Sequence, residues 1–314
     1  MNLDVGFEYN DGDVLEEFLR TLRSPSKNKY KSYRGLPIRY AGGKSRAIGH
    51  ILEHFPSNLK KMASPFVGGG SVEIATAKEL GVDVVAYDVF DILCNYWQVQ
   101  VKHPVRLANM LDEYEPTQKQ YKIFKEELRQ HWKNEKRITS KMRLAMIYWF
   151  NHNLSYGPGF LGWMSKIYQE QERYERLVNK VRNFSCSNFR VEHGGFADTI
   201  PAHKGTFLYC DPPYYLEDGK MFKGIYPMRN FPVHHNGFDH ILLCSLLKKH
   251  KGGFVLSYND CDTIREMYKD YDIVEVRWQY SLGQGETRIG KNRIEAGQDS
   301  YVKDSHEILI VNHG

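Results

Sequence analysis

The segment from residue 62 to residue 88 limits the possible fold of this chain more than any other part of the sequence. A short apolar run at 62–66 is followed by glycines, a helical pattern at 71–80 and a second apolar run at 82–87 that ends at Asp88. Strand, glycine-rich turn, helix and strand in this order predict two parallel strands, because a helical crossover returns the chain in the same direction. The sequence therefore predicts an α/β fold.

Further strand signals follow a long helical interruption. Three helical segments lie within residues 104–154, one of them at 138–154 with Thr139 or Ser140 as its cap, and another helix is expected at 167–181. The later strands are expected at 189–192, 206–210, 253–258, 273–280 and 307–311, and further helices at 14–22, 44–55, 237–249 and 261–268. We therefore expect a catalytic α/β domain built from residues 36–95 and 188–314, a helical insert at 96–187 and an N-terminal extension at 1–35.

The positive charge of the chain is concentrated in the helical insert. The 314 residues carry 43 Lys and Arg against 38 Asp and Glu, a net charge of +5 that decides little. Residues 116–190 hold 15 Lys and Arg against 6 Asp and Glu, a local +9, which leaves about −4 for the rest. Such a block favours a polyanionic partner, although a solvated helical face has the same composition.

Composition excludes several classes of protein. The longest apolar run, at 144–150, is far shorter than the roughly 18 residues that span a bilayer, so we expect no membrane association. Residues 1–17 are acidic and lack the apolar core of a signal peptide. The five cysteines and 13 His, His234 and His235 among them, show no metal-ligand spacing, so we expect no metal and a reducing, cytoplasmic setting.

The most specific motif is Asp211-Pro212-Pro213-Tyr214, directly after the expected strand at 206–210. Open α/β proteins build their sites at the carboxyl ends of strands. Two prolines remove two N–H donors, so the motif offers mainly acceptors, namely the Asp211 carboxylate and the peptide carbonyls. It suits a substrate that donates hydrogens, such as an exocyclic amine, and Tyr214 adds a flat face for a ring.

The glycines at 68–70 allow a ligand to approach the backbone closely. In a dinucleotide fingerprint a glycine would stand where Glu73 stands, and a charged Glu73 in the first turn of a helix would repel a pyrophosphate, so NAD and FAD are disfavoured. A nucleoside without phosphates is compatible with the pattern, because Asp88 ends the next strand and can accept hydrogen bonds from ribose hydroxyls. Taken alone, however, the glycine run favours a tight turn without a ligand. The Gly-Gly-Lys at 42–44 lacks the spacing of a phosphate-binding loop, which argues against nucleotide hydrolysis.

Five motifs in sequence order resemble the DNA adenine methylase (Dam) family. They are Tyr-Ala-Gly-Gly-Lys at 40–44, Phe-Val-Gly-Gly-Gly at 66–70, Asp88, Phe-Ala-Asp at 196–198 and Asp-Pro-Pro-Tyr at 211–214. The resemblance covers about residues 36–312, including 256–260 and the tail residues Gly283, Arg288, Lys291 and Glu307. Members of this family (D12 class, α arrangement) use S-adenosylmethionine to methylate adenine N6 in DNA. The resemblance implies a Rossmann-like methyltransferase sheet, with the target-recognition domain inserted where the basic block lies.

The resemblance also implies a role for each matched position. S-adenosylmethionine would be bound by Tyr40, Ala41, Gly42, Gly43, Lys44, Phe66, Gly68, Gly70, Asp88, Asp198 and Asp211. Among them, Asp88 would bind the ribose and Asp198 would approach the cofactor adenine. The catalytic motif would be Asp211, Pro212, Pro213 and Tyr214, with Asp211 between the cofactor and the target base. Many relatives have Trp where Tyr40 stands.

We interpret the chemistry as methylation of an adenine that has left the DNA duplex. The N6 lone pair is delocalised into the ring, so N6 is a poor nucleophile. The Asp211 carboxylate and the Pro212 carbonyl would accept the two N6 hydrogens and stabilise the charge that develops on nitrogen. Stacking on Tyr214 would partly offset the cost of base flipping.

DNA contacts are expected from the helical insert. Phosphate contacts are expected from Lys133, Lys136, Arg137, Lys141 and Arg143, and base contacts from Asn151, Asn153, Ser155 and Tyr156. An equal alternative is that Asn151 and Asn153 only cap the end of a helix. The aromatic run at 148–150 is expected in the core.

Other functions remain as alternatives. N4-cytosine methylation poses the same amine chemistry, but relatives acting on cytosine more often carry Ser in place of Asp211. Methylation of RNA adenine or of a protein glutamine usually goes with Asn at that position. The intact Asp88 and Asp211 argue against a catalytically inactive DNA-binding protein. The expected partner is double-stranded DNA in a bacterial or phage-infected cell, with a cognate restriction endonuclease left open and a monomer or weak dimer as the state of the chain.

Overall fold

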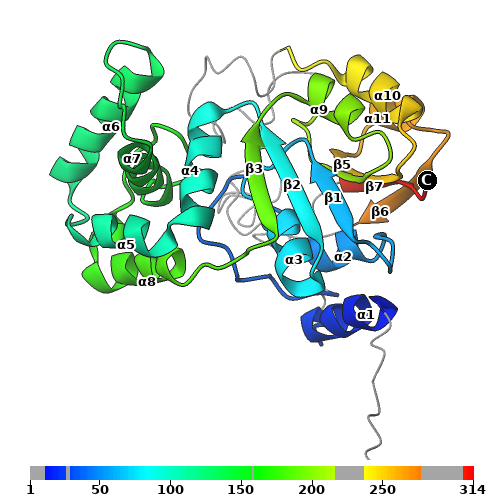
Figure 1. The fold of residues 1–314 in the computed structure, drawn as a ribbon, viewed down its shortest axis with the longest axis horizontal. Coiled ribbons are helices and arrows are strands. Elements are labelled where there is room, and N and C mark those ends of the chain that lie inside the picture. The colour runs from blue at the N-terminus through cyan, green and yellow to red at the C-terminus, as the bar shows by residue number, and fades with distance from the viewer. Residues whose placement is uncertain (1–10, 26–28, 158, 216–236, 277–306) are drawn as a thin grey trace, which may run out of the picture.

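The computed structural model of the protein describes residues 11–25, 29–157, 159–215, 237–276 and 307–314. Within these residues a seven-stranded sheet runs through the middle of the molecule in the order β3-β2-β1-β4-β5-β7-β6 (Figure 1). The strands are β1 (Lys61–Ser64), β2 (Asp83–Asp88), β3 (Phe189–His193), β4 (Phe207–Cys210), β5 (Phe254–Asn259), β6 (Asp272–Val276) and β7 (Glu307–Asn312). Neighbours among β1 to β5 are parallel, whereas β7 is antiparallel to both β5 and β6.

The strand order places a switch point between β1 and β4. The chain first adds β2 and β3 on one side of β1 and then returns to add β4 on the other side. Open α/β sheets bind ligands at the carboxyl ends of strands beside such a switch point. The glycine turn follows β1 and the Asp-Pro-Pro-Tyr motif follows β4, so the fold brings both motifs to this place.

Helices cover both faces of the sheet. One face packs against α2 (Ile48–Leu52), α3 (Ser71–Leu80) and α4 (Asp91–Lys102), and the other against α9 (Phe196–Ala202), α10 (His240–Lys249) and α11 (Asp262–Met267). Side chains alternate accordingly, so that Val84 and Tyr209 face the first layer while Val85 and Leu208 face the second. Because both faces are buried, these strands appear in the sequence as nearly continuous apolar runs.

A helical unit packs beside the β3 edge of the sheet (Figure 1). It contains α5 (Pro104–Asp112), α6 (Gln118–Trp132), α7 (Lys141–Asn153), the short 3-10 helix η1 (Lys166–Gln169) and α8 (Gln171–Arg182). Helix α7 lies in the centre of the unit, and Tyr148, Trp149 and Phe150 are at most 1% exposed, as expected. A helix that is apolar on all sides must be enclosed by others, which explains this central place.

The N-terminal segment packs on the half of the molecule that contains the sheet. Helix α1 (Asp11–Leu22) lies against α2 and α3 (Figure 1), with Leu15 and Leu22 buried. Tyr30 packs on Gly49 so closely that a Cβ added there would lie 2.3 Å from the ring. The Tyr30 hydroxyl donates to Glu53. The described part of the expected N-terminal extension is therefore packed onto α2 and α3 rather than separate from them.

The structure confirms the α/β fold and the positions of the expected strands, with small shifts of their ends. Ser140 caps α7 by accepting a hydrogen bond from Arg143 N at 3.2 Å, as expected. The helix expected at 44–55 is reduced to α2, and the one expected at 167–181 is interrupted at Glu170, between η1 and α8. Residues 277–280 of the expected strand lie outside the described residues.

Two helices, α4 and α9, are absent from the sequence expectations. The domain boundary expected at residue 95 falls inside α4, which packs on β3 with one side and on α7 with another. The helical unit is therefore anchored to the sheet by a continuous helix rather than by a linker. Among the helices of the described residues, none combines the length and apolar character that a membrane crossing requires.

Candidate active site

The turn after β1 is shaped by its glycines. Gly68 and Gly70 have φ angles of +45° and +64°, in the left-handed region that favours glycine. A Cβ on Gly69 would lie 2.5 Å from Cβ of Tyr40, so the ring of Tyr40 rests directly on the turn. The indole Nε1 of Trp97 donates to Gly68 O at 3.0 Å and fixes the turn from behind. The glycines thus leave a backbone surface that side chains would otherwise fill.

Asp88 stands beside this turn at the carboxyl end of β2. Its Oδ2 accepts a hydrogen bond from Gly68 N at 3.1 Å and its Oδ1 from Phe90 N at 2.9 Å. Burial raises the pKa of this carboxyl, while the backbone donors act in the opposite direction. The structure therefore places Asp88 next to the glycine turn, where a ribose ligand was expected.

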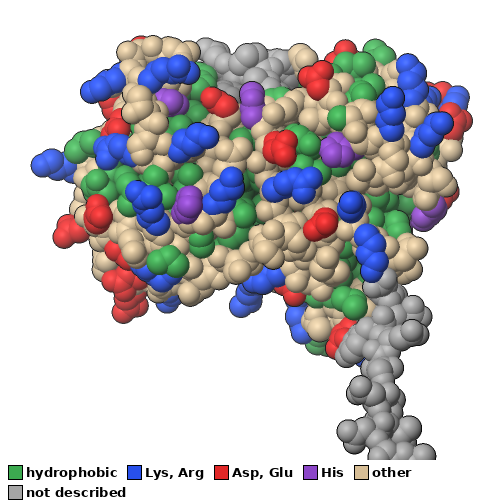
Figure 2. Space-filling view, viewed as in Figure 1, with side chains coloured by type: hydrophobic (Ala, Val, Ile, Leu, Met, Phe, Trp, Pro, Cys, Tyr) green, Lys and Arg blue, Asp and Glu red, His purple; other side chains and the backbone are tan. Residues whose placement is uncertain are grey.

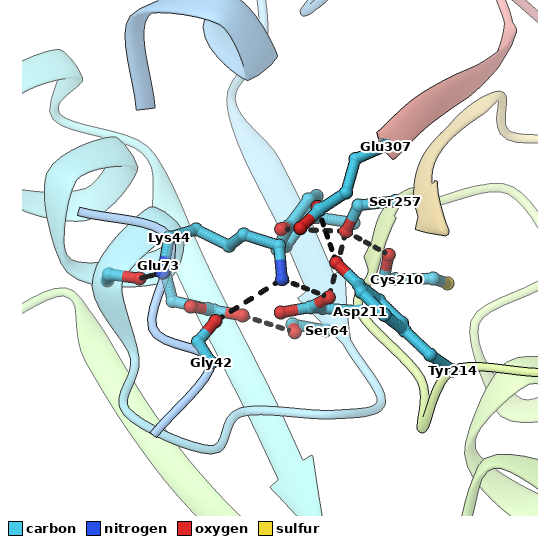
Figure 3. A network of polar contacts seen from close by, with 11 residues as sticks. Gly42, Lys44, Ser64, Glu73, Cys210, Asp211, Tyr214, Ser257 and Glu307 are labelled. Carbon is cyan, nitrogen blue, oxygen red and sulfur yellow. Dashed lines mark hydrogen bonds and ion pairs between the residues drawn. The ribbon is translucent and has the colours of Figure 1, made fainter. Parts of the chain in front are cut away.

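Asp211 lies in a network of polar side chains from distant parts of the chain (Figure 3). Lys44 Nζ is 2.8 Å from Asp211 Oδ1, and Ser257 Oγ donates to the same oxygen at 3.0 Å. Lys44 is only 3% exposed and also donates to Gly42 O at 3.3 Å. Both described contacts of the Asp211 carboxylate use Oδ1.

The rest of the motif is held from two sides. Asn259, at the end of β5, accepts from Tyr215 N at 2.9 Å and donates to Tyr215 O at 2.8 Å. The hydroxyl of Tyr214 donates to Glu307 Oε2 on β7, and the Lys44 ammonium lies 5.0 Å from the Tyr214 ring centroid. The motif is therefore fixed before any substrate binds.

Glu73 is a buried acid close to this network. It is 2% exposed and accepts a hydrogen bond from Ser64 Oγ at 2.6 Å. Burial raises the pKa of Glu73 to about 8, so the acid is mostly protonated at neutral pH. The sequence predicts that a charged Glu73 repels a pyrophosphate. This reason is wrong, because Glu73 in the first turn of α3 is mostly uncharged at neutral pH.

An aromatic cluster completes the carboxyl edge of the sheet. The ring of Phe66 lies 5.7 Å from Phe196 and 5.8 Å from Phe238, and the last two are 5.0 Å apart. Asp198 is exposed in the first turn of α9, two residues after Phe196. Aromatic faces, a ribose acceptor at Asp88 and an open glycine backbone are the groups that a nucleoside ligand requires, so these residues fit S-adenosylmethionine.

A cavity of about 440 Å³ is lined by Tyr40 and by Gly69 of the glycine turn, among others. Gly42 and Gly43 line it from the expected cofactor motif, and Arg34, Arg39 and Lys180 add positive charge. The guanidinium of Arg39 donates to the carbonyls of Asn153 and Ser155, at 2.6 Å and 3.3 Å, which ties the motif to the end of α7.

The residues expected to contact DNA divide into two groups. Lys133, Lys136, Arg137, Lys141 and Tyr156 are exposed. Asn151, Asn153 and Ser155, in contrast, are fully buried. The Asn151 and Asn153 side-chain oxygens accept from Leu161 N and Arg39 N, both at 2.8 Å, so in this structure they hold backbone at the helix end.

Arg143 is partly exposed and forms an ion pair. Its guanidinium makes two bonds of 2.8 Å to the Glu127 carboxylate, so its charge is matched within the helical unit. Trp163, which the sequence interpretation did not single out, is 77% exposed, and its carbonyl accepts from Tyr156 N at 2.7 Å. Tyr156 and Trp163 are thus two exposed aromatic residues on the loop after α7, joined by a backbone hydrogen bond.

Sequence reasoning missed the residues that support the motif rather than form it. Ser257 and Asn259 lie in the 256–260 segment of the resemblance but had no assigned role. Ser64 gave no signal, and Glu73 was interpreted as a charged residue at a helix start rather than as a buried acid. Gly283, Arg288, Lys291, His234 and His235 lie outside the described residues. In the part of the chain that the structure describes, no three His, Cys, Asp or Glu side chains are grouped to hold a metal ion.

Comparison with known proteins identifies relatives of the whole α/β unit. A family described as D12 class N6 adenine-specific DNA methyltransferase matches residues 40–282. The type II methyltransferase M.FokI of Planomicrobium okeanokoites is 24% identical over 91% of this chain and 44% of its own length. The modification methylase StsI of Streptococcus sanguinis is 24% identical over 97% of this chain and 46% of its length. The DNA adenine methylase of Serratia marcescens is 29% identical over 56% of this chain and 66% of its length. The chain thus spans about half the length of the first two relatives.

Proposed function

Because this chain belongs to the family of D12 class N6 adenine-specific DNA methyltransferases, we propose that it transfers a methyl group from S-adenosylmethionine to N6 of adenine in double-stranded DNA. The observation that carries the proposal is the position of Asp211, held on one oxygen by Lys44 and Ser257 at the carboxyl end of β4. An anchored carboxylate with its second oxygen open is what an exocyclic amine needs as acceptor.

The chain's own residues would act on the adenine nitrogen. Asp211 Oδ2 and the Pro212 carbonyl accept the two N6 hydrogens, which favours a tetrahedral nitrogen with an available lone pair. S-adenosylmethionine supplies an electrophilic methyl group when it is bound. The nitrogen gains a methyl group and loses one proton, for which Asp211 is the nearest acceptor. Since the network around Asp211 is formed in advance, little reorganisation is needed during the reaction.

For the cofactor we propose a site formed by the glycine turn, Asp88 and the aromatic cluster. Asp88 would bind the ribose and Phe66 would lie against the adenine ring, with Asp198 at the rim for the exocyclic amine. The resemblance implies that Lys44 binds the cofactor. We propose that it also holds Asp211, because Lys44 Nζ lies 2.8 Å from Asp211 Oδ1.

DNA would be bound by the helical unit, residues 96–187, together with the carboxyl edge of the sheet. The connection between α6 and α7 projects at the end of the molecule where the parallel strands terminate (Figure 1). Lys133, Lys136, Arg137 and Lys141 lie on or next to this connection and are exposed, which suits contacts to phosphates. Tyr156 is available for a base.

A direct experiment separates this function from its alternatives. The purified chain is incubated with S-adenosylmethionine labelled in the methyl group and with duplex DNA, RNA or protein extract, and the modified bases are identified. We expect N6-methyladenine in DNA. Label in cytosine, in RNA or in protein would refute the proposal, and the absence of transfer would leave the inactive DNA-binding alternative.

The catalytic assignment has its own test. Asp211→Ala should abolish methyl transfer while DNA binding stays measurable, and more than a tenth of wild-type turnover would contradict the role. Asp83→Ala is the matched control, because Asp83 is an exposed carboxylate at the amino end of β2. The cellular setting we propose is the cytoplasm of a bacterial or phage-infected cell, with a cognate restriction endonuclease as the partner to search for and a monomer or weak dimer as the active state.

A further inference from the structure

Glu73 has no part in the function proposed above, yet it is one of the most deeply buried acids described. It lies in the first turn of α3, is 2% exposed and accepts a hydrogen bond from Ser64 Oγ at 2.6 Å. Ser64 is the last residue of β1, so this bond ties the helix to the strand immediately before the glycine turn. A buried acid is costly for a fold unless it stays protonated or is paired.

The surroundings of Glu73 contain a single described ammonium group and a second carboxylate. Figure 3 shows the side chains of Glu73, Lys44 and Asp211 directed into one polar cluster. The charges on Asp211 and Lys44 both act on Glu73, in opposite directions. Lys44 is itself 3% exposed and lies 2.8 Å from Asp211. One buried ammonium can neutralise only one of two carboxylates where little water screens them.

We propose that Glu73 is a positioning residue for Asp211. While Glu73 keeps its proton, Lys44 pairs with Asp211 alone and holds the carboxylate where it meets the amine of the target base. When Glu73 loses its proton, two carboxylates compete for Lys44, and Asp211 is drawn out of place. This inference rests on the proposed function, and it makes the reaction sensitive to alkaline pH through a residue that touches neither substrate.

The titratable groups that face Glu73 are Asp211, Lys44, Tyr209 and Cys210, of which the last two belong to β4. Burial raises the pKa of Tyr209 and of Cys210 well above their ordinary values, so both stay neutral near pH 8. The pKa of Glu73, raised to about 8, therefore sets the expected position of the alkaline limb.

The test is the pH profile of methyl transfer between pH 6.5 and 9.5. For the wild type we expect kcat to fall at least ten-fold between pH 7 and 9.5, about as the protonated fraction of Glu73 falls. Glu73→Gln mimics the protonated acid and should keep a rate near that of the wild type at pH 7, with a fall of less than two-fold at high pH. Glu73→Ala should lose at least ten-fold at every pH, because the cluster loses its packing and the bond from Ser64.

Two further variants make the test specific. Ser64→Ala removes a hydrogen bond that favours the ionised acid, so the alkaline limb should move to higher pH. Glu79→Gln is the matched control, because Glu79 lies on the same helix and accepts a hydrogen bond from the Tyr33 hydroxyl at 2.6 Å. Its profile should superimpose on that of the wild type. Superimposable profiles for Glu73→Gln and the wild type would overturn the inference.

A measurement without any substrate separates this inference from the proposed function. Because the folded state holds the Glu73 proton more tightly than the unfolded chain, the wild type should lose stability as pH rises from about 4.5 to about 8. The Tm of Glu73→Gln should therefore exceed that of the wild type by a margin that grows up to pH 8 and then levels off. A constant margin contradicts the inference, whereas a wild type that methylates nothing refutes the function and leaves this titration valid.

Discussion

The two halves of the molecule differ in where their charged side chains lie. At the carboxyl edge of the sheet a few charges are buried, and Lys44 meets Asp211 with side chains that are 4% and 21% exposed. In the helical unit the charges are numerous and lie at the surface, where Arg129 pairs with Glu126 and Glu135. Figure 2 shows acidic side chains among the basic ones on this face of the unit.

The difference explains why net charge is a poor guide to a binding surface. A minority of the 15 Lys and Arg in the block are paired with nearby acids among the described residues. They include Arg129 with Glu126, Arg143 with Glu127, Arg173 with Glu170 and Arg182 with Asp112. Lys133, Lys136, Arg137 and Lys141 have no ion pair among the described residues. These four lie on or next to the α6–α7 connection, whereas other exposed cations of the block are spread along it, namely Lys119, Lys122, Lys166, Arg176 and Lys180.

Among the variants that test this difference between the two halves, we expect the largest loss of activity from a change at Asp211. Asp211→Asn keeps the shape of the side chain but removes the charge that Lys44 and the developing positive nitrogen require. We expect a loss of at least about 100-fold in kcat, the size seen when a preorganised electrostatic group is removed. DNA binding measured by fluorescence anisotropy should change less than two-fold.

Breaking the buried pair from its other side should come next. Lys44→Met leaves Asp211 with Ser257 as its described hydrogen-bond donor, and such a loss of one partner costs on the order of 3 kcal/mol. We expect a lower Tm and at least about a 30-fold loss of kcat. Arg129→Met is the surface counterpart and should leave both quantities unchanged within error. Equal effects from the two variants would remove the distinction between the halves.

The exposed cations should show a smaller and different effect. Replacing Lys133, Lys136 and Arg137 together with Ala should weaken DNA binding at low salt. The plot of log Kd against log salt should flatten by about 0.9 for each phosphate that is no longer neutralised. Arg129→Ala should leave the slope unchanged, because its charge is already matched. An unchanged slope in the triple variant would show that DNA is bound elsewhere.

The smallest effect concerns stability in acid. His152 is 4% exposed, stacks on Tyr40 at 5.4 Å and has neither ring nitrogen hydrogen-bonded among the described residues. Burial lowers its pKa to about 3, so the folded state resists the proton that the unfolded chain accepts below about pH 6.5. Stability is therefore lost as pH falls from about 6.5 to about 3.

His152→Phe keeps the stacking and removes this dependence. Relative to its value at pH 7.5, the free energy of unfolding at pH 5 should be about 2 kcal/mol higher in the variant than in the wild type. Denaturant titrations of both proteins at the two pH values measure this difference. Parallel losses in both proteins would indicate that His152 is hydrated in solution.

The sheet was predictable because its strands are buried on both faces. Each appears as a short apolar run, and the glycines and Asp211 mark the ends of β1 and β4. Helix α9 could not be read in the same way, since it has seven residues and contains Pro201. Helix α4 was missed because its buried face, with Tyr96 and Trp97, belongs to two layers at once and shows no simple period.

The site was predictable only as far as its motifs. Asp88 and Asp211 follow strands directly, so the local sequence places them at the sheet edge. The supporting hydrogen bonds are made by Ser257, Asn259 and Ser64. They depend on which strands become neighbours, and no local sequence pattern specifies the strand order. The burial of Asn153 depends likewise on Arg39, which approaches only when the two halves pack together. That of Asn151 depends on how the loop after α7 folds back to place Leu161 beside it.

The place of β7 in the sheet has a consequence for the time at which the enzyme is completed during synthesis. Strand β7 is inserted between β5 and β6, and its Glu307 receives the hydroxyl of Tyr214, 93 residues earlier in the chain. A nascent chain that has already exposed the Asp-Pro-Pro-Tyr motif still lacks this partner and one edge of the sheet around it. The ribosome therefore delivers the Asp-Pro-Pro-Tyr motif well before the strand that holds it, so the motif cannot reach its final geometry until residue 307 has been translated.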